Sequence, residues 1–149
     1  MADAMKLLDE LKLRVRAAGE AGGVADYLHV LLMEGALKTV VDLVDARPEL
    51  LGELLPIVAN PEAGMNVRFG AGAVFERSAG SAALGALVPR LGTLAQHPDA
   101  RVRADACHYL GLSGSADARD HLRHRLADES ADVREIAADS LAELAKAAG

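Results

Sequence analysis

Apolar residues in the second half of the chain recur with the spacing of an α-helix. Three segments begin with a Val-Arg pair, at Val67, Val102 and Val133. Each segment carries alanine four positions after the valine and a large apolar residue eight positions after it, which places all three residues on one helical stripe. The segments are preceded by turn and capping sequences: Asn60-Pro61, His97-Pro98-Asp99 and Asp128-Glu129-Ser130. The pattern predicts three related helices.

A second set of apolar patterns lies between these segments. Leucines and valines at helical spacing predict helices over residues 51–58, 82–96 and 118–126, the first with Pro48 near its start. Gly80 and Gly114 stand where the Val-Arg helices are expected to end. The unit is therefore helix, turn, helix, and such pairs must stack on one another to bury their apolar faces.

The first third of the chain is less regular. One helix is expected from Ala4 to Val15, and the stretch from Val24 to Ala46 is expected to be helical with an interruption at Gly35. We predict a single domain over residues 1–149, with a helical cap or degenerate repeat at 1–46 and repeats at 47–80, 81–114 and 115–149.

Residues Leu112-Ser113-Gly114 through Leu144 resemble the short HEAT-like repeat of phycobiliprotein lyases and many bacterial proteins. Residues 81–113 resemble the same unit through His97-Pro98-Asp99-Ala100-Arg101-Val102-Arg103. The resemblance implies an all-α, right-handed α-solenoid of antiparallel helix pairs, whose second helices line a concave face. It also implies that Arg68, Arg103 and Arg134 tie adjacent turns together, with Glu62 and Asp99 as candidate acidic partners.

Composition narrows the function classes. Aromatic residues make up 3% of the chain and tryptophan is absent, so the core is expected to be aliphatic. A net charge of −6 disfavours nucleic acid as the main partner. No apolar run is long enough to span a bilayer, and a cytoplasmic protein is expected. The single cysteine excludes an internal disulfide.

That cysteine, Cys107, has two interpretations. Superposed repeats place it level with Gly72 and Ala138, which leaves open space for a cleft where His108 or Arg103 activates the thiol. Alternatively, it fills a helix interface as a small apolar residue, which is the more common situation.

Two further features are singled out. Gly70 and Gly72 interrupt a predicted helix, and close helix packing is the commoner reason for such glycines, ahead of a ligand. Phe69 lies off the Val67 stripe, so it is either an exposed partner anchor or a core residue.

Asp117, His121, His124 and Asp128 fall on one helical stripe and are weak candidates for a metal site. Interleaved arginines make a solvated, charge-paired face the preferred interpretation, so no metal is expected.

The sequence favours a protein-binding scaffold over an enzyme, because no phosphate-binding loop, HExxH or GxSxG motif is present. No cofactor is expected, and homo-oligomerisation is left open. The expected partner is a protein or peptide segment bound on the concave face. The candidate residues are Phe69, Glu76, Arg101, Asp105, Cys107, His108 and Asp139. The alternatives are a lyase-like helper acting on a tetrapyrrole, or a redox protein using Cys107.

Overall fold

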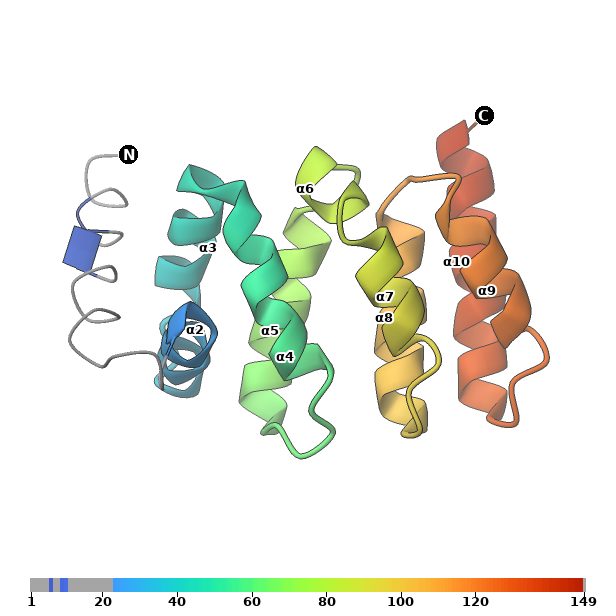
Figure 1. The fold of residues 1–149 in the computed structure, drawn as a ribbon, viewed down its shortest axis with the longest axis horizontal. Coiled ribbons are helices and arrows are strands. Elements are labelled where there is room, and N and C mark those ends of the chain that lie inside the picture. Colours follow the sequence, from blue (N-terminus) through green and yellow to red (C-terminus); the bar gives the residue numbers. More distant parts are fainter. Residues whose placement is uncertain (1–5, 7–8, 11–22, 149) are drawn as a thin grey trace. The chain divides into compact units, whose positions relative to one another are not determined.

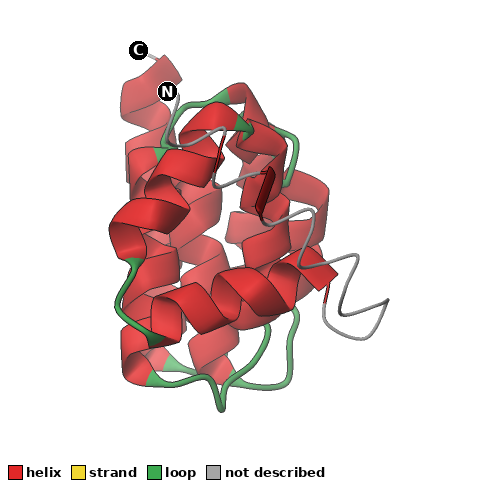
Figure 2. Ribbon diagram, turned by 90° about the vertical axis from the view of Figure 1, so that its left-hand side faces the viewer, coloured by secondary structure: helices red, strands yellow, loops and turns green. Residues whose placement is uncertain are grey.

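The structure, a computed structural model, describes residues 6, 9–10 and 23–148 of the chain. The described residues form α-helices and one 3-10 helix and contain no strand (Figures 1 and 2). The all-α solenoid class expected from the sequence is thus confirmed. In chain order the elements are α2 (Gly23–Met33), α3 (Leu37–Ala46), η2 (Pro48–Leu54), α4 (Leu55–Val58), α5 (Met65–Arg77), α6 (Ala82–Gly85), α7 (Val88–Leu94), α8 (Ala100–Leu112), α9 (Ala118–Arg125) and α10 (Ala131–Ala148).

The chain forms two compact units. Unit 1 comprises Met1–Ile57 and Glu62–Val74, and unit 2 comprises Val58–Pro61 and Phe75–Gly149. The single domain and the repeat boundaries expected from the sequence stay predictions. The helix expected over residues 4–15 falls almost entirely outside the described residues.

The stripe that defined the repeat is buried, except that its last residue in α10, Leu141, is half-buried. Val102, Ala106 and Leu110 of α8 are fully buried, as are Val133 and Ala137 of α10. In unit 2, α8 packs against α7, α9 and α10, so its apolar stripe is covered on several sides. Within that core the rings of Phe75 and Tyr109 stack with their centroids 4.4 Å apart. Phe75 is the largest fully buried side chain of the described residues.

Helix ends follow the expected chemistry. The Asp99 side chain caps α8 by accepting a hydrogen bond from the Arg101 amide at 2.8 Å. Gly80 and Gly114 follow α5 and α8 with φ of 72° and 68°, a conformation in which glycine avoids the Cβ penalty. The expected interruption at Gly35 is confirmed as well, because it separates α2 from α3 with a φ of 78°.

Prolines break two helices that the apolar spacing predicted as continuous. The segment from Pro48 to Leu54 is a 3-10 helix, and the Leu55 amide bonds to the Gly52 carbonyl. The next residue, Pro56, has no amide hydrogen to offer that carbonyl. Likewise the helix expected over 82–96 is divided into α6 and α7, because the Pro89 ring lacks a donor for the carbonyl of Gly85 and would clash with it.

The short helix expected over 118–126 is also corrected. Ala118 and Leu122 are buried, but α9 ends at Arg125 and Leu126 is exposed.

In unit 1, α2 and α3 pack against η2 through an aliphatic core that includes Leu28, Leu43 and Leu54. A Cβ at Gly70 would lie 2.7 Å from Cδ2 of Leu32, so glycine lets α5 approach α2 closely. Helix packing, the commoner of the two reasons considered for Gly70, is therefore confirmed.

Candidate functional site

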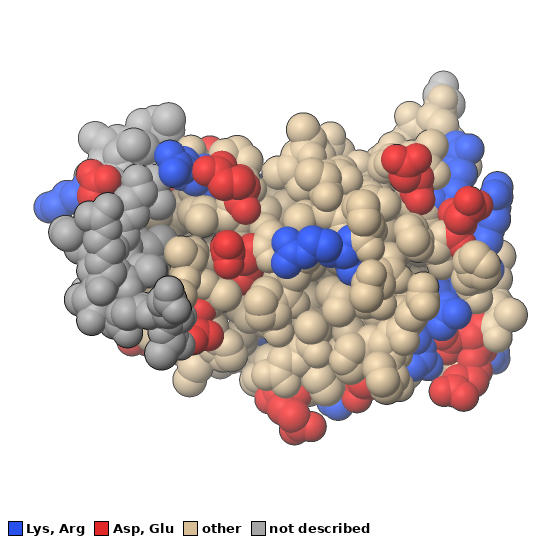
Figure 3. Space-filling view, in the orientation of Figure 1, with Lys and Arg blue, Asp and Glu red and all other residues tan. Residues whose placement is uncertain are grey.

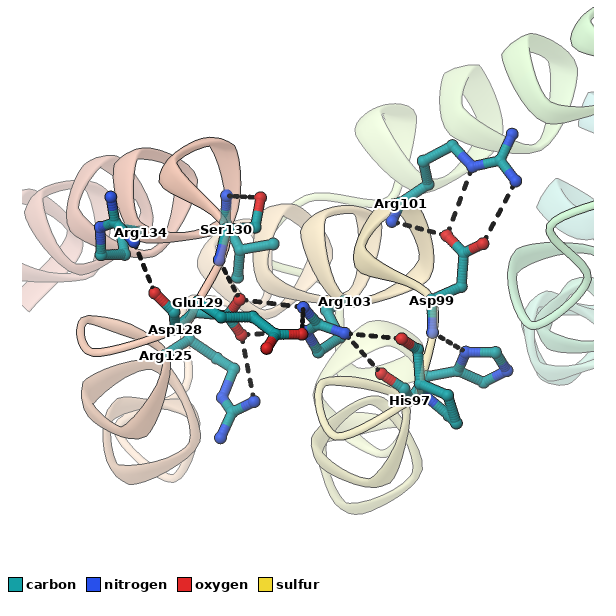
Figure 4. A network of polar contacts seen from close by, with 11 residues as sticks. His97, Asp99, Arg101, Arg103, Arg125, Asp128, Glu129, Ser130 and Arg134 are labelled. Carbon is teal, nitrogen blue, oxygen red and sulfur yellow. Dashed lines mark hydrogen bonds and ion pairs between the residues drawn. The ribbon is translucent and has the colours of Figure 1, made fainter.

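Arg103 anchors a buried polar network in unit 2 (Figure 4). Its Nε and Nη2 each donate to the Asp128 carboxylate at 2.9 Å, the two-bond geometry that suits guanidinium and carboxylate. Its Nη1 also donates to the carbonyls of His97 and Pro98. One side chain thus joins the turn before α8 to the turn before α10, the role that the repeat resemblance implied.

Asp128 holds the other end of the network. Its carboxylate accepts hydrogen bonds from the Ser130 amide at 2.9 Å and from Nη1 of Arg125 at 3.2 Å, and its carbonyl accepts one from Nη1 of Arg134 at 2.7 Å. The Arg103 hydrogen bonds hold the pKa of Asp128 below its usual value, although burial opposes this. The pair is therefore an ionised scaffold element.

Asp99 does not pair with Arg103, which corrects the partner suggested from the sequence. Its carboxylate bonds to Nε and Nη2 of Arg101 at 3.3 and 3.2 Å, and these hydrogen bonds lower its pKa. The physical reason is its capping position, which turns the carboxylate toward the first turn of α8. Arg68 lies half-buried in unit 1 and Glu62 is exposed there.

Cys107 is fully buried, which agrees with the more common of its two interpretations, a small apolar residue in a helix interface, and not with an open cleft. Desolvation by burial raises the pKa of its thiol to about 11. Ala138, at the equivalent position of α10, is exposed in the part of the chain that the structure describes. Cys107 is therefore neither a surface contact nor an activated thiol in this structure, which counts against the redox alternative.

Thiol labelling checks this assignment. We expect a neutral aromatic disulfide reagent to modify native Cys107 at least about a hundredfold more slowly than the urea-unfolded chain, because the thiolate is the reactive form. The modification rate is measured from the absorbance of the aromatic thiol that the reagent releases when Cys107 attacks it. Equal rates in the two states would contradict the burial.

The exposed residues of α8 and α10 form a polar surface in unit 2. Arg101, Asp105 and His108 follow one stripe of α8, with Asp105 half-buried. Asp132, Glu135 and Asp139 follow a stripe of α10, on which Asp132 and Asp139 are the repeat equivalents of Arg101 and His108. We call these six residues the α8–α10 face. Nε2 of His108 lies 3.4 Å from Oε1 of Glu76, near the end of α5. Because Arg101 is paired with Asp99, the face is acidic.

The stripe considered for metal does not form. Asp128 lies beyond the end of α9 and is buried against Arg103, so it does not follow Asp117, His121 and His124. The surface over α9 instead carries interleaved basic and acidic side chains, as Figure 3 shows, including an Arg123–Asp120 pair at 3.2 Å. The His121 ring occupies the space that the missing side chain of Gly92 leaves free. Among the residues described, no cluster of three or more metal-ligating side chains is found.

Unit 1 contains a groove that the sequence did not reveal. It has a volume of about 550 Å³ and is lined by Leu32, Met33, Glu34, Gly35, Leu37, Asn66, Phe69 and Gly70. Phe69 is 73% exposed, so its interpretation as a core residue is wrong, and its role as a partner anchor stays a prediction. The sequence did not point to four of these lining residues, Met33, Glu34, Leu37 and Asn66. Only tertiary contact between α2 and α5 brings them to Phe69, and the sole sequence signal was the position of Phe69 off the buried stripe.

Comparison with known families agrees with this architecture. A family model for HEAT repeats matches residues 53–142, and the chain belongs to that family. No curated protein and no solved structure gives a match. HEAT repeats generally mediate protein binding, because stacked helices present an extended surface. Among the described helices, none is long and apolar enough to cross a membrane.

Proposed function

We propose that this protein is a non-catalytic adaptor that binds a segment of another protein, with its main apolar contact at the groove of unit 1. The observation that carries the proposal is the distribution of exposed apolar side chains. Of the five large exposed ones among the described residues, four belong to unit 1. They are Val30, Met33, Met65 and Phe69.

These side chains form two short helical stripes. Val30 and Met33 are three residues apart on α2, and Met65 and Phe69 are four apart on α5, so each pair lies on one face of its helix. Met33 and Phe69 both line the groove. Apolar side chains gathered around a groove mark a binding surface more often than isolated ones do, and methionine and aromatic residues are enriched in protein interfaces.

The α8–α10 face provides a second, polar contact surface in unit 2. Its acidic side chains would select a partner with basic residues and would affect association rate and specificity more than affinity. The Arg103–Asp128 network stabilises the α8–α10 face, because it holds the starts of α8 and α10 in fixed positions. A lyase-like helper role remains an alternative, but it rests only on the resemblance of the repeats at residues 81–113 and 112–144.

Co-purification tests the adaptor role. A tagged full-length chain carrying Phe69→Ser should lose its bound partner, because removing a central aromatic anchor costs about 2 kcal/mol or more, roughly 30-fold in affinity. Quantitative mass spectrometry of the retained proteins measures the loss. Stability should change little, since the ring is mostly exposed.

Leu126→Ser is the matched control, because Leu126 is an exposed apolar residue of unit 2. Leu126→Ser should leave the set of retained proteins unchanged. Asp139→Lys reverses one charge of the α8–α10 face and tests whether that face contributes to binding. An identical set of retained proteins on the wild type and on all three variants would sink the proposal.

A further inference from the structure

We infer that the groove of unit 1 selects a peptide segment in which a large apolar side chain is accompanied by a lysine or arginine. This inference rests on the proposed adaptor function and adds the chemistry of the partner. The lining of the groove has an apolar part and a charged part, the Glu34 carboxylate, and the two parts require different groups from the ligand.

The apolar part is formed by Leu32, Met33, Leu37 and Phe69. Leu32 is buried and closes the floor, while Met33 and Phe69 stand 63% and 73% exposed at the edges. Gly70 keeps α5 close to α2 at this point, so the floor is continuous between the two helices. Methionine side chains adapt to differently shaped apolar groups. This part of the groove therefore accepts a large aliphatic or aromatic side chain.

The charged part of the lining follows the end of α2. Glu34 and Gly35 line the groove immediately after the last residue of α2, Met33. The aligned peptide dipoles of a helix leave partial negative charge at its C-terminus, which adds to the Glu34 carboxylate. Glu34 forms no ion pair or side-chain hydrogen bond with any residue that the structure describes. A cation bound here would therefore meet an unneutralised carboxylate.

The charge of the whole unit acts in the same direction. Acidic side chains outnumber basic ones in its described part. Lys38 and Arg47 are already engaged, in the Lys38–Asp42 and Arg47–Glu49 pairs at 3.1 and 2.8 Å. The acidic residues are Asp9, Glu10, Asp26, Glu34, Asp42, Asp45, Glu49, Glu53 and Glu62, and the basic ones are Lys6, Lys38, Arg47 and Arg68. An acidic segment would be repelled, and a basic one attracted.

On the opposite side of the groove, Asn66 is exposed on the first turn of α5. Its amide can donate to or accept from a peptide backbone without selecting charge. The two helices therefore make different contacts with the bound peptide. Met33 and Phe69 bind the apolar side chain, Glu34 and the end of α2 bind the cation, and Asn66 contacts the peptide backbone.

The experiment uses a phage-displayed random peptide library selected on the immobilised full-length chain, with a parallel selection on Phe69→Ser. Peptides enriched on the wild type and lost on Phe69→Ser should combine a large apolar residue with lysine or arginine. Fluorescence anisotropy of one such labelled peptide should then show an affinity about fivefold lower for Glu34→Gln. Glu53→Gln, an exposed carboxylate of the same unit outside the groove, is the matched control and should bind as the wild type does.

The salt dependence gives a second readout. Raising the ionic strength should weaken binding to the wild type and to Glu53→Gln more than binding to Glu34→Gln, because the screened attraction is already missing there. Phe69-dependent peptides that lack basic residues, or that bind Glu34→Gln and wild type equally, would overturn the inference and leave the adaptor role standing. If no selected peptide depends on Phe69, both fail.

Discussion

Replacing Asp128 with alanine should lower the free energy of unfolding of unit 2 by about 3–5 kcal/mol, the cost of leaving a buried charge without its partner. The side chains of Arg103 and Asp128 are only 6% and 2% exposed, and the remaining acidic neighbour of Arg103, Oε1 of Glu129, is more distant at 3.7 Å. Asp128→Ala also frees the Ser130 amide and removes the ion pair with Arg125. Urea unfolding followed by circular dichroism at the helical band measures the change.

Two further variants separate the unpaired charge from simple loss of packing. Arg101→Ala removes the Arg101–Asp99 pair, which is largely exposed, and should cost no more than about 1 kcal/mol. The double variant Arg103→Met with Asp128→Ala should be more stable than Asp128→Ala alone, because no buried charge remains. If the double variant is no more stable than the single one, the buried charge is not the cause of the loss.

Gly111→Ala should destabilise unit 2 by about 1–3 kcal/mol, although alanine is normally the better helix former. A Cβ at Gly111 would lie 2.7 Å from Cβ and 2.9 Å from Cα of Ser140. The second contact is with backbone, so α8 and α10 would have to separate to relieve it. The midpoint of urea unfolding, compared with that of the wild type, measures the effect.

Gly85→Ala is the matched control for this substitution. Nothing lies within 4 Å of a Cβ built there, and its φ is not in the left-handed region, so we expect a stabilisation of up to about 1 kcal/mol. A Gly111→Ala protein as stable as Gly85→Ala would contradict the close approach of α8 and α10.

The two units contribute different things to the proposed adaptor. In unit 2, the Arg103–Asp128 network and the Gly111 contact fix α8 against α10, which suits a stable surface that presents charged side chains. In unit 1, the packing of α5 on α2 leaves large apolar side chains exposed around a groove. Exposed apolar surface of this kind persists in a functional protein when a partner covers it for part of the time.

Periodicity in the sequence was sufficient for the helical repeat. Apolar residues four and eight positions after Val102 had to be buried, because any helix with that spacing presents one apolar face. The helix ends at Gly80 and Gly114 and the cap at Asp99 were equally predictable, since they depend on residues close in sequence. The helix breaks at Pro56 and Pro89 were also predictable from the sequence, because the effect of proline on a helix is local.

The candidate sites depended on contacts between residues far apart in the chain. Cys107 looked accessible because its repeat equivalents are glycine and alanine, but α8 has neighbours on both sides whereas α10 ends the described stack. Asp128 looked like part of a helical stripe, yet it binds an arginine that lies 25 residues earlier. The groove around Phe69 joins residues from α2 and α5 that no periodicity connects.

The sequence by itself therefore determined the class of fold, the repeat unit, the helix caps and the acidic character of the chain, because all of these follow from local spacing and composition. Only the tertiary structure decided which of the singled-out residues are accessible. It buried Cys107, paired Arg103 with Asp128 and left Phe69 exposed beside Met33 and Glu34. The physical reason is that exposure and ion pairing depend on which helices pack together, and helix periodicity defines an apolar face without naming the neighbour that covers it.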